Sequence, residues 1–141
     1  NHESEFRQNN YLIMKIINSA KSIKENKLNQ LTIGSLEYKR DWSYAGDVAE
    51  AIFKVCEFGE RHSYVIGSGV SHQIVDIVKI VFDYFNLNWK EHIIVNKELL
   101  REGDPISILS DPSLINKELE WKYKTPFHEV IEKCIQYKTK H

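Results

Sequence analysis

Three clusters of polar residues carry the groups that could do chemistry in this chain. Residues 1–7 bring together an amide, an imidazole, carboxylates and a guanidinium. The second cluster is Arg40-Asp41-Trp42, and the third is Arg101 with Asp104 three positions later. A guanidinium can donate two parallel hydrogen bonds to a phosphate, and a neighbouring carboxylate can hold it in position. A carboxylate can also accept hydrogen bonds from sugar hydroxyls. The clusters are therefore candidates for contacts with a phosphate or with sugar hydroxyls.

Each cluster also has an ordinary structural interpretation. Arg40 could be a strand arginine paired with a neighbouring acid, and Arg101 and Asp104 could be solvated loop residues. Lys15 lies on an expected helix, where a lysine is usually a solvated surface residue. The residue types alone leave these alternatives open.

Apolar residues at helical spacing predict five helices that would position these clusters. The helices are expected at about residues 9–26, 47–59, 72–86, 111–119 and from 126 onward. Short β-branched and aromatic segments predict strands. These are expected at residues 30–34, 38–42, 63–66 and 92–95, with an irregular stretch at 97–110. The fold class is therefore α/β, or α+β-like for this chain taken alone, with too few strands for a complete doubly wound sheet.

The second helix and the two cysteines carry predictions about burial. Asp47 is expected to be the N-cap of that helix. Both cysteines, Cys56 and Cys134, fall in apolar helical patterns, so we expect buried, reduced thiols in a cytoplasmic protein. The expected buried face of the second helix consists of Val48, Ala49, Ile52, Phe53 and Cys56.

Composition and charge exclude several classes of partner. The formal net charge is −1, so the chain has no bulk attraction for nucleic acid or an anionic membrane. Apolar residues make up 42% and charged residues 28%, which is typical of a folded soluble domain. No apolar run approaches the length of a membrane span. The six histidines, at positions 2, 62, 72, 92, 128 and 141, show no metal-ligand spacing, so no metal is expected.

Two short motifs are too weak to carry a function. Tyr11 and Lys15 match the Tyr-x-x-x-Lys pattern of short-chain dehydrogenases at only two fixed positions. Gly67 and Gly69 follow an expected strand and precede an expected helix, but the third glycine of a dinucleotide-binding fingerprint is missing.

Taken together, the clusters resemble one family, the GDP-mannose 4,6-dehydratases, which are extended short-chain dehydrogenases/reductases. Asn1-His2-Glu3-Ser4 resembles that family's Asn-His-Glu-Ser-Pro-Arg-Arg segment. Arg40-Asp41-Trp42 resembles its Arg-Asp-Trp-Gly, and Arg101 with Asp104 its Arg-Pro-x-Glu. Leu119-Glu120-Trp121 is similar to the Leu-x-Trp near the family's C-terminus. The similarities are colinear over essentially the whole chain.

The resemblance implies a Rossmann-type enzyme of which residues 1–141 form the C-terminal, substrate-binding portion. The NADP-binding Rossmann half, with the catalytic groups, would be absent from these residues, so we expect no catalytic residue here and no turnover by this chain alone. His2 and Arg7 would contact NADP. Nucleotide-sugar contacts would come from Asn1, Lys15, Arg40, Arg101 and Asp104.

The implied reaction converts GDP-mannose into GDP-4-dehydro-6-deoxymannose, in an enzyme expected to be a homo-oligomer. The sequence departs from the family at several positions: Glu5-Phe6 replaces Pro-Arg, Met14 replaces Arg, Ser43-Tyr44 replaces Gly-His, and Asp104 replaces Glu. A related nucleotide sugar is therefore a possible ligand. Two alternatives are a GDP-sugar epimerase or reductase on the same scaffold, and a non-catalytic remnant that binds nucleotide sugars.

Overall fold

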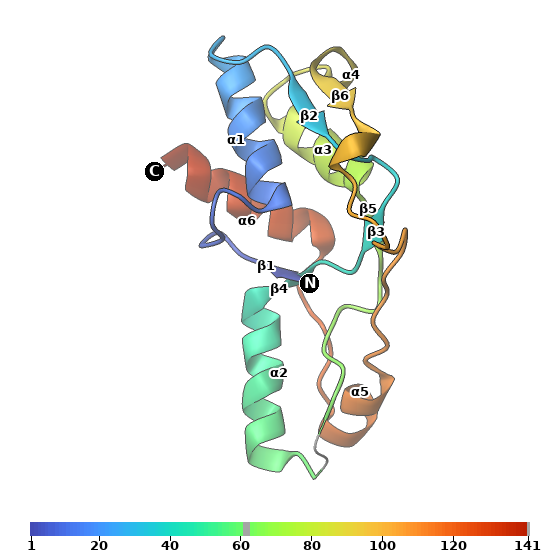
Figure 1. Ribbon diagram of the computed structural model, residues 1–141. Coiled ribbons are helices and arrows are strands. Elements are labelled where there is room, and N and C mark those ends of the chain that lie inside the picture. Colours follow the sequence, from blue (N-terminus) through green and yellow to red (C-terminus); the bar gives the residue numbers. More distant parts are fainter. Residues whose placement is uncertain (61–62, 141) are drawn as a thin grey trace.

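The computed structural model describes residues 1–60 and 63–140 (Figure 1). Three long helices form its main layer: α1 (Leu12–Lys24), α3 (Ile74–Tyr84) and α6 (Phe127–Lys140). Their facing sides are fully buried, because each helix carries apolar residues on one stripe. In Figure 1 these helices occupy the upper part of the molecule, and a second pair, α2 and α5, lies below them. The main hydrophobic core therefore sits between α1, α3 and α6.

The strands are short and form three separate pairs. The longest, β2 (Leu31–Ile33) and β6 (Ile93–Val95), run parallel beside α1 and α3. The strand β1 (His2–Glu3) is parallel to β4 (Ser43–Tyr44), so the first residues of the chain lie at the centre of the molecule. The third pair is antiparallel and joins β3 (Lys39–Arg40) to β5 (His72–Gln73). The β1–β4 pair thus places residues 2–3 beside residues 43–44, which directly follow the segment 38–42.

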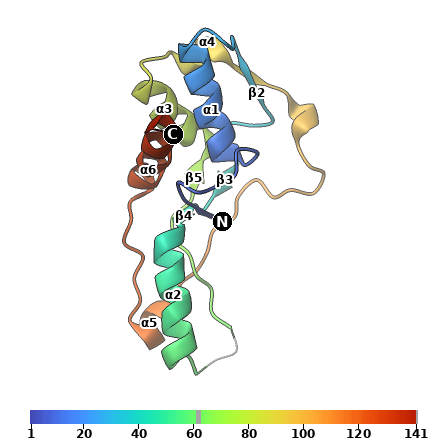
Figure 2. The ribbon, with the colours of Figure 1, turned by 90° about the vertical axis from the view of Figure 1, so that its left-hand side faces the viewer.

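A second, smaller core holds the lower part together. There α2 (Ala45–Phe58) packs against α5 (Ser113–Leu119), and Figure 2 shows both below the three-helix layer. The buried residues of this core are Ala51, Ile115, Leu119 and Trp121. Two further short helices, α4 (Trp89–His92) and the 3-10 helix η1 (Lys97–Leu99), flank β6.

The five expected helices are confirmed, with boundaries shifted by a few residues. The strands expected at 30–34 and 92–95 are also confirmed. The expected strand at 38–42 is instead two short strands, β3 and β4. The one expected at 63–66 is wrong, because those residues form no strand in the described chain. A strand requires a hydrogen-bonded neighbour, and none of the described residues pairs with this segment.

The expected buried face of α2 is wrong. Ile52 and Phe53 are 51% and 59% exposed, whereas Ala51 is fully buried. Asp47 is not the N-cap, because the helix begins at Ala45. Its carboxylate instead accepts hydrogen bonds from the backbone nitrogens of Lys124 and Thr125, at 3.0 and 2.8 Å. This anchor turns Ala51, one helical turn further on, toward α5.

The two cysteines differ in burial, and the rotation of α2 explains the exposure of one of them, Cys56. Cys56 is exposed, which contradicts the prediction, because it lies about 140° around the helix axis from the buried Ala51. Cys134 is fully buried in the main core, as predicted. Burial raises the pKa of the Cys134 thiol to about 12, so this side chain stays protonated.

Candidate functional site

A cavity of about 370 Å³ collects most of the predicted site residues. It opens between the start of α1, the strand β3 and the segment that follows η1. Five of the seven predicted residues line it: Asn1, Arg7, Arg40, Arg101 and Asp104. Asn1 and Asp104 are 103 positions apart in the sequence, so the convergence of these residues depends on the tertiary structure. We refer to this space as the main cavity.

Lys15 lines an adjoining cavity rather than the main one. The two cavities share several walls: Tyr11, Leu12, Ile33, Gly34, Leu99 and Arg101. Lys15 is exposed, and its ammonium donates a hydrogen bond to the carbonyl of Thr32 at 3.3 Å. The two cavities therefore present four cationic side chains in adjoining spaces.

His2 lies away from the main cavity. It is exposed and lines a separate cavity of about 330 Å³, together with Ser4, Phe6, Gln8 and Arg7. Although much of the side chain is exposed, partial burial of the imidazole is the main cause that lowers the pKa of His2, and the nearby Arg7 guanidinium adds to it. The imidazole is therefore uncharged at neutral pH. Arg7 is the one predicted residue that borders both spaces.

Arg40 is held by Asp104, not by Asp41. The Arg40 Nη2 atom lies 2.7 Å from Asp104 Oδ1, and Nη1 donates to the carbonyl of Lys39 at 2.7 Å. The ring of Tyr38 lies 5.5 Å from the guanidinium carbon. We expected the neighbouring Asp41 to take this role, but successive side chains in an extended segment point to opposite sides.

Asp41 faces the other way and is buried. Its carboxylate accepts hydrogen bonds from the backbone nitrogens of Ser68 and Gly69, at 3.1 and 2.9 Å, and from the hydroxyls of Ser43, Ser68 and Ser110. Burial would raise the pKa of Asp41, but these hydrogen bonds outweigh it and hold the pKa below its ordinary value. Asp41 therefore ties the 68–70 turn and Ser110 to the segment that carries Arg40.

Two residues of the main cavity, Glu3 and Tyr11, were not among the predicted site residues. Glu3 is buried, with 5% of its surface exposed, and lies 3.5 Å from Arg7. The Arg7 guanidinium lies over the ring of Tyr11, 3.7 Å from its centroid. The spacing of four between Glu3, Arg7 and Tyr11 gave no signal, because such a spacing brings side chains together on a helix and α1 begins only at Leu12.

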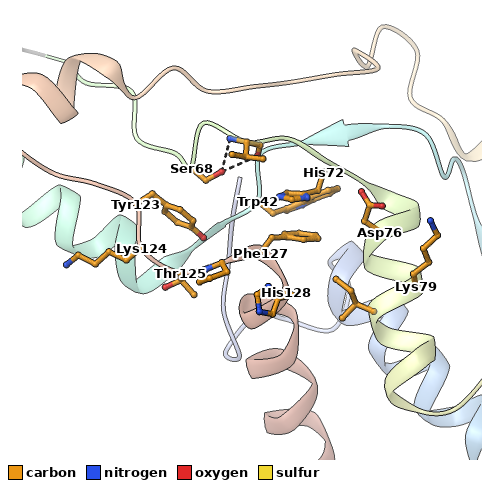
Figure 3. A pocket seen from close by; sticks show the side chains of 13 residues that line it. Trp42, Ser68, His72, Asp76, Lys79, Tyr123, Lys124, Thr125, Phe127 and His128 are labelled. Carbon is orange, nitrogen blue, oxygen red and sulfur yellow. Dashed lines mark hydrogen bonds between the residues drawn. The ribbon is translucent and has the colours of Figure 1, made fainter.

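A larger cavity, of about 570 Å³, contains none of the seven predicted residues (Figure 3). Its centre is a group of stacked rings in which Phe127 lies 3.8 Å from His72 and 6.1 Å from Trp42, measured between centroids. Burial is the main cause that lowers the pKa of His72, so its ring is uncharged at neutral pH. Trp42 lines this cavity and the main one. Lys79 and Lys124 are the cations of the larger cavity, whereas three arginines line the main cavity, which therefore offers the guanidinium groups that suit an anionic ligand.

Neither a metal centre nor a membrane span is found in the described residues. No three histidine, cysteine or acidic side chains among them are grouped closely enough to hold a metal ion. His62 and His141 lie outside the described residues. None of the helices in this part of the chain is long and apolar enough to cross a membrane.

Comparison with solved structures defines the fold class. RMD from Pseudomonas aeruginosa, solved with NADPH, superimposes on the whole chain with a TM-score of 0.86 at 16% identity, and the chain covers 47% of it. A dTDP-glucose 4,6-dehydratase from Bacillus anthracis, solved with NAD, gives a TM-score of 0.83 at 18% identity, with 43% of that protein covered. The chain therefore has the fold of part of a Rossmann-type short-chain dehydrogenase/reductase.

Comparison of sequences identifies the family. The family model for GDP-mannose 4,6 dehydratase matches residues 1–134, so the chain belongs to this family. It is 30% identical to GDP-mannose 4,6 dehydratase 1 of Arabidopsis thaliana over 135 residues, and 27% identical to the human GDP-mannose 4,6 dehydratase. The aligned part is 96% of this chain in both cases, but only 37% and 41% of the relatives. The chain thus spans less than half the length of these relatives.

Proposed function

We propose that this chain is the nucleotide-sugar-binding portion of a GDP-mannose 4,6-dehydratase-like lyase. The observation that carries the proposal is the main cavity, where Arg40 and Arg101, from distant parts of the sequence, line one space with Asp104. Because the chain belongs to this family, we take the class of ligand to be a nucleoside diphosphate sugar. Two guanidinium groups suit a diphosphate, because each can donate two parallel hydrogen bonds.

In this proposal the chain binds and orients the substrate. Arg40 and Arg101 hold the diphosphate, Lys15 lies in the adjoining cavity toward one end of the ligand, and Asn1 contacts the sugar. Binding energy from the nucleotide end would then fix the hexose for reaction at C4, C5 and C6. Asp104 keeps Arg40 in position and has its second carboxylate oxygen available to a ribose hydroxyl.

The cofactor would be bound mainly outside these 141 residues. NADP would supply the hydride chemistry, but the described residues form no complete dinucleotide site. The turn at Gly67-Ser68-Gly69 resembles a phosphate loop, yet its backbone N–H groups at Ser68 and Gly69 already donate to Asp41. His2 could contact only the edge of the cofactor. We therefore propose no catalytic residue in this chain and expect no turnover by it alone.

The partner that completes the enzyme would cover the exposed face of α2. Ile52, Phe53 and Phe58 are all more than half exposed, and an apolar patch of this kind usually marks an interface. We propose that this face meets the rest of the enzyme or a second copy of it, in a cytoplasmic homo-oligomer.

A GDP-sugar epimerase or reductase remains the second candidate. A UDP-glucose 4-epimerase from Thermotoga maritima, solved with UDP-glucose, gives a TM-score of 0.81 over 99% of this chain. The fold of the binding portion is thus common to enzymes with different reactions. The catalytic residues of the other half would distinguish a dehydratase from an epimerase or reductase.

Isothermal titration calorimetry of the 141-residue chain tests the binding role. GDP and GDP-mannose should bind weakly, and Arg40→Ala or Arg101→Ala should each weaken binding by about tenfold or more, the equivalent of one strong charge-assisted contact. Lys97→Ala, on η1 outside both cavities, is the matched control. If neither ligand binds, or if the Arg40→Ala/Arg101→Ala double variant binds as well as the unaltered chain, the proposed function is wrong.

A further inference from the structure

The larger cavity, of about 570 Å³, has the size and the lining of a site for a small molecule. Cavities that bind such molecules usually measure about 300–1000 Å³ and combine apolar walls with a few placed polar groups. Here the rings of Trp42, His72 and Phe127 form the centre of the lining. Val70 and Ile80 add aliphatic walls. None of the residues proposed to bind the nucleotide sugar lines this space, so it calls for a ligand of its own.

The stacked rings favour a flat ligand. The planes of His72 and Phe127 differ by only 5°, with 3.8 Å between the ring centroids, and Trp42 lies 6.1 Å from Phe127 at an angle of 29°. His72 and Phe127 are both partly exposed, so the stack borders the open space of the cavity. Aromatic rings pair well with other planar rings, either offset and stacked or edge to face. A planar ring would therefore extend a stack that the fold has already assembled.

Tyr123 supplies a polar group that would orient such a ring. Its Oη atom accepts a hydrogen bond from the backbone nitrogen of Tyr44 at 2.9 Å, and among the contacts of the described residues none takes up the hydrogen of the Tyr123 hydroxyl. Burial is the main cause that raises the pKa of Tyr123 to about 12, so the hydroxyl keeps this hydrogen at neutral pH. In Figure 3, Tyr123 lies beside the ring group with its hydroxyl turned toward it. The hydroxyl can therefore donate one hydrogen bond to a ligand.

The charged groups of this lining are largely matched, unlike the arginines of the main cavity. The Lys124 ammonium lies 2.7 Å from a carboxylate oxygen of Glu50. The Asp76 carboxylate accepts a hydrogen bond from the backbone nitrogen of Gln73 at 2.9 Å, and Lys79, of opposite charge, lies about one turn further along α3. The described lining thus has no cluster of unpaired cations that would attract a phosphate. An uncharged ligand suits this space better than an anion.

We propose that the larger cavity binds a small, uncharged molecule that has a planar aromatic ring and one hydrogen-bond acceptor. The ring would pack against His72 and Phe127, and the acceptor would receive the hydrogen of the Tyr123 hydroxyl. Trp42 lines both cavities, so its indole would separate this ligand from the nucleotide sugar. This binding role is independent of the proposed function.

Nuclear magnetic resonance titration of the 141-residue chain tests the class of ligand with three probes. Benzamide has a planar ring and a carbonyl acceptor, cyclohexanecarboxamide has the same acceptor without the planar ring, and benzoate carries a negative charge. Benzamide should bind with a Kd of about 1 mM, as suits so small a molecule. It should shift the amide resonances of Thr125 and Phe127 and leave those of Arg101 and Asp104 unchanged. Cyclohexanecarboxamide should bind at least about threefold more weakly because it cannot stack, and benzoate should bind no more tightly than benzamide.

Tyr123→Phe tests the orienting hydroxyl, because it removes the donor and keeps the ring. Benzamide binding should weaken by about fivefold, which corresponds to one neutral hydrogen bond. Tyr84→Phe, which removes an exposed hydroxyl from α3 outside the cavity, is the matched control and should bind benzamide normally. Tyr123→Phe also removes the acceptor of the Tyr44 N–H, so thermal unfolding must show that the variant folds. If it does not fold, the three probes on the unaltered chain decide.

Four results would overturn the proposal. The first is no binding of benzamide at about ten times the expected Kd, where a real site would be about 90% occupied. The second is equal binding of cyclohexanecarboxamide, which would show that the planar ring is not recognised. The third is tighter binding of benzoate, which would make the site anionic in preference. The fourth is unchanged benzamide binding by a folded Tyr123→Phe variant.

Discussion

The Arg40 guanidinium and the Asp104 carboxylate lie 2.7 Å apart and join two segments that are 64 residues apart in the sequence. Around this pair, β3 and the segment after η1 exchange backbone hydrogen bonds: Lys39 donates to Ile106 at 2.7 Å, and Ile108 donates to Lys39 at 3.1 Å. The pair thus fastens one wall of the main cavity to another. It also explains why an acid is useful at position 104 before any ligand binds.

Asp104→Ala should loosen this wall without unfolding the protein. Because both side chains keep some contact with solvent, we expect a loss of only about 1 kcal/mol in the free energy of unfolding. Hydrogen exchange should become faster at the backbone amides of Lys39 and Ile108, which join the two segments. Glu102 is an exposed neighbour, so Glu102→Ala should change neither the free energy of unfolding nor the exchange rates of these amides. Unchanged exchange at both amides would contradict the fastening role.

Asp41→Asn should destabilise the protein strongly. A buried carboxylate that accepts several hydrogen bonds contributes more than a neutral amide can, so a loss of about 3 kcal/mol in the free energy of unfolding is expected. Chemical denaturation at pH 7 measures it. Asp111→Asn, whose carboxylate is exposed and accepts from Ser113, should cost much less.

The pH dependence of stability provides a second check on Asp41. Its pKa is lowered in the folded protein, so the folded state binds fewer protons than the unfolded chain in the acidic range. The stabilisation is present above the ordinary carboxyl pKa of about 4 and is lost as the pH falls through the lowered value. Asp41→Asn should therefore show a shallower fall in stability between about pH 5 and pH 2. An identical slope in both proteins would count against this account.

The two cysteines should differ sharply in reactivity. Cys56 is exposed on α2 and should react with a thiol reagent within minutes at pH 8 in the folded protein. Cys134 should react only after unfolding, because it is fully buried and its pKa is raised to about 12. Mass spectrometry after brief alkylation measures both sites. Cys56→Ser should abolish the rapid labelling, and protection of Cys56 in solution would show that the exposed face of α2 is covered by another copy.

The sequence by itself determined the family and five of the six α-helices of the described residues, and it supplied candidates for the site. The apolar spacing of residues 12–24 and 127–140 is a local property of the chain, and α1 and α6 form where it predicts them. The candidate site residues were proposed from their chemical types, their order and the family resemblance, and five of the seven line one cavity. Such features can be read from a sequence because they depend on neighbours along the chain.

Only the tertiary structure decided which groups meet. Arg40 pairs with Asp104 and not with its neighbour Asp41, because adjacent side chains of an extended segment point to opposite sides. The buried face of α2 was wrong because the anchor of Asp47 on the backbone before α6, 77 residues away, sets the rotation of that helix. Arg7 contacts Glu3 and Tyr11 within one non-helical segment, and these three residues line the main cavity together with Arg40 of β3. Such pairings depend on contacts between distant segments, which periodicity along the chain does not encode.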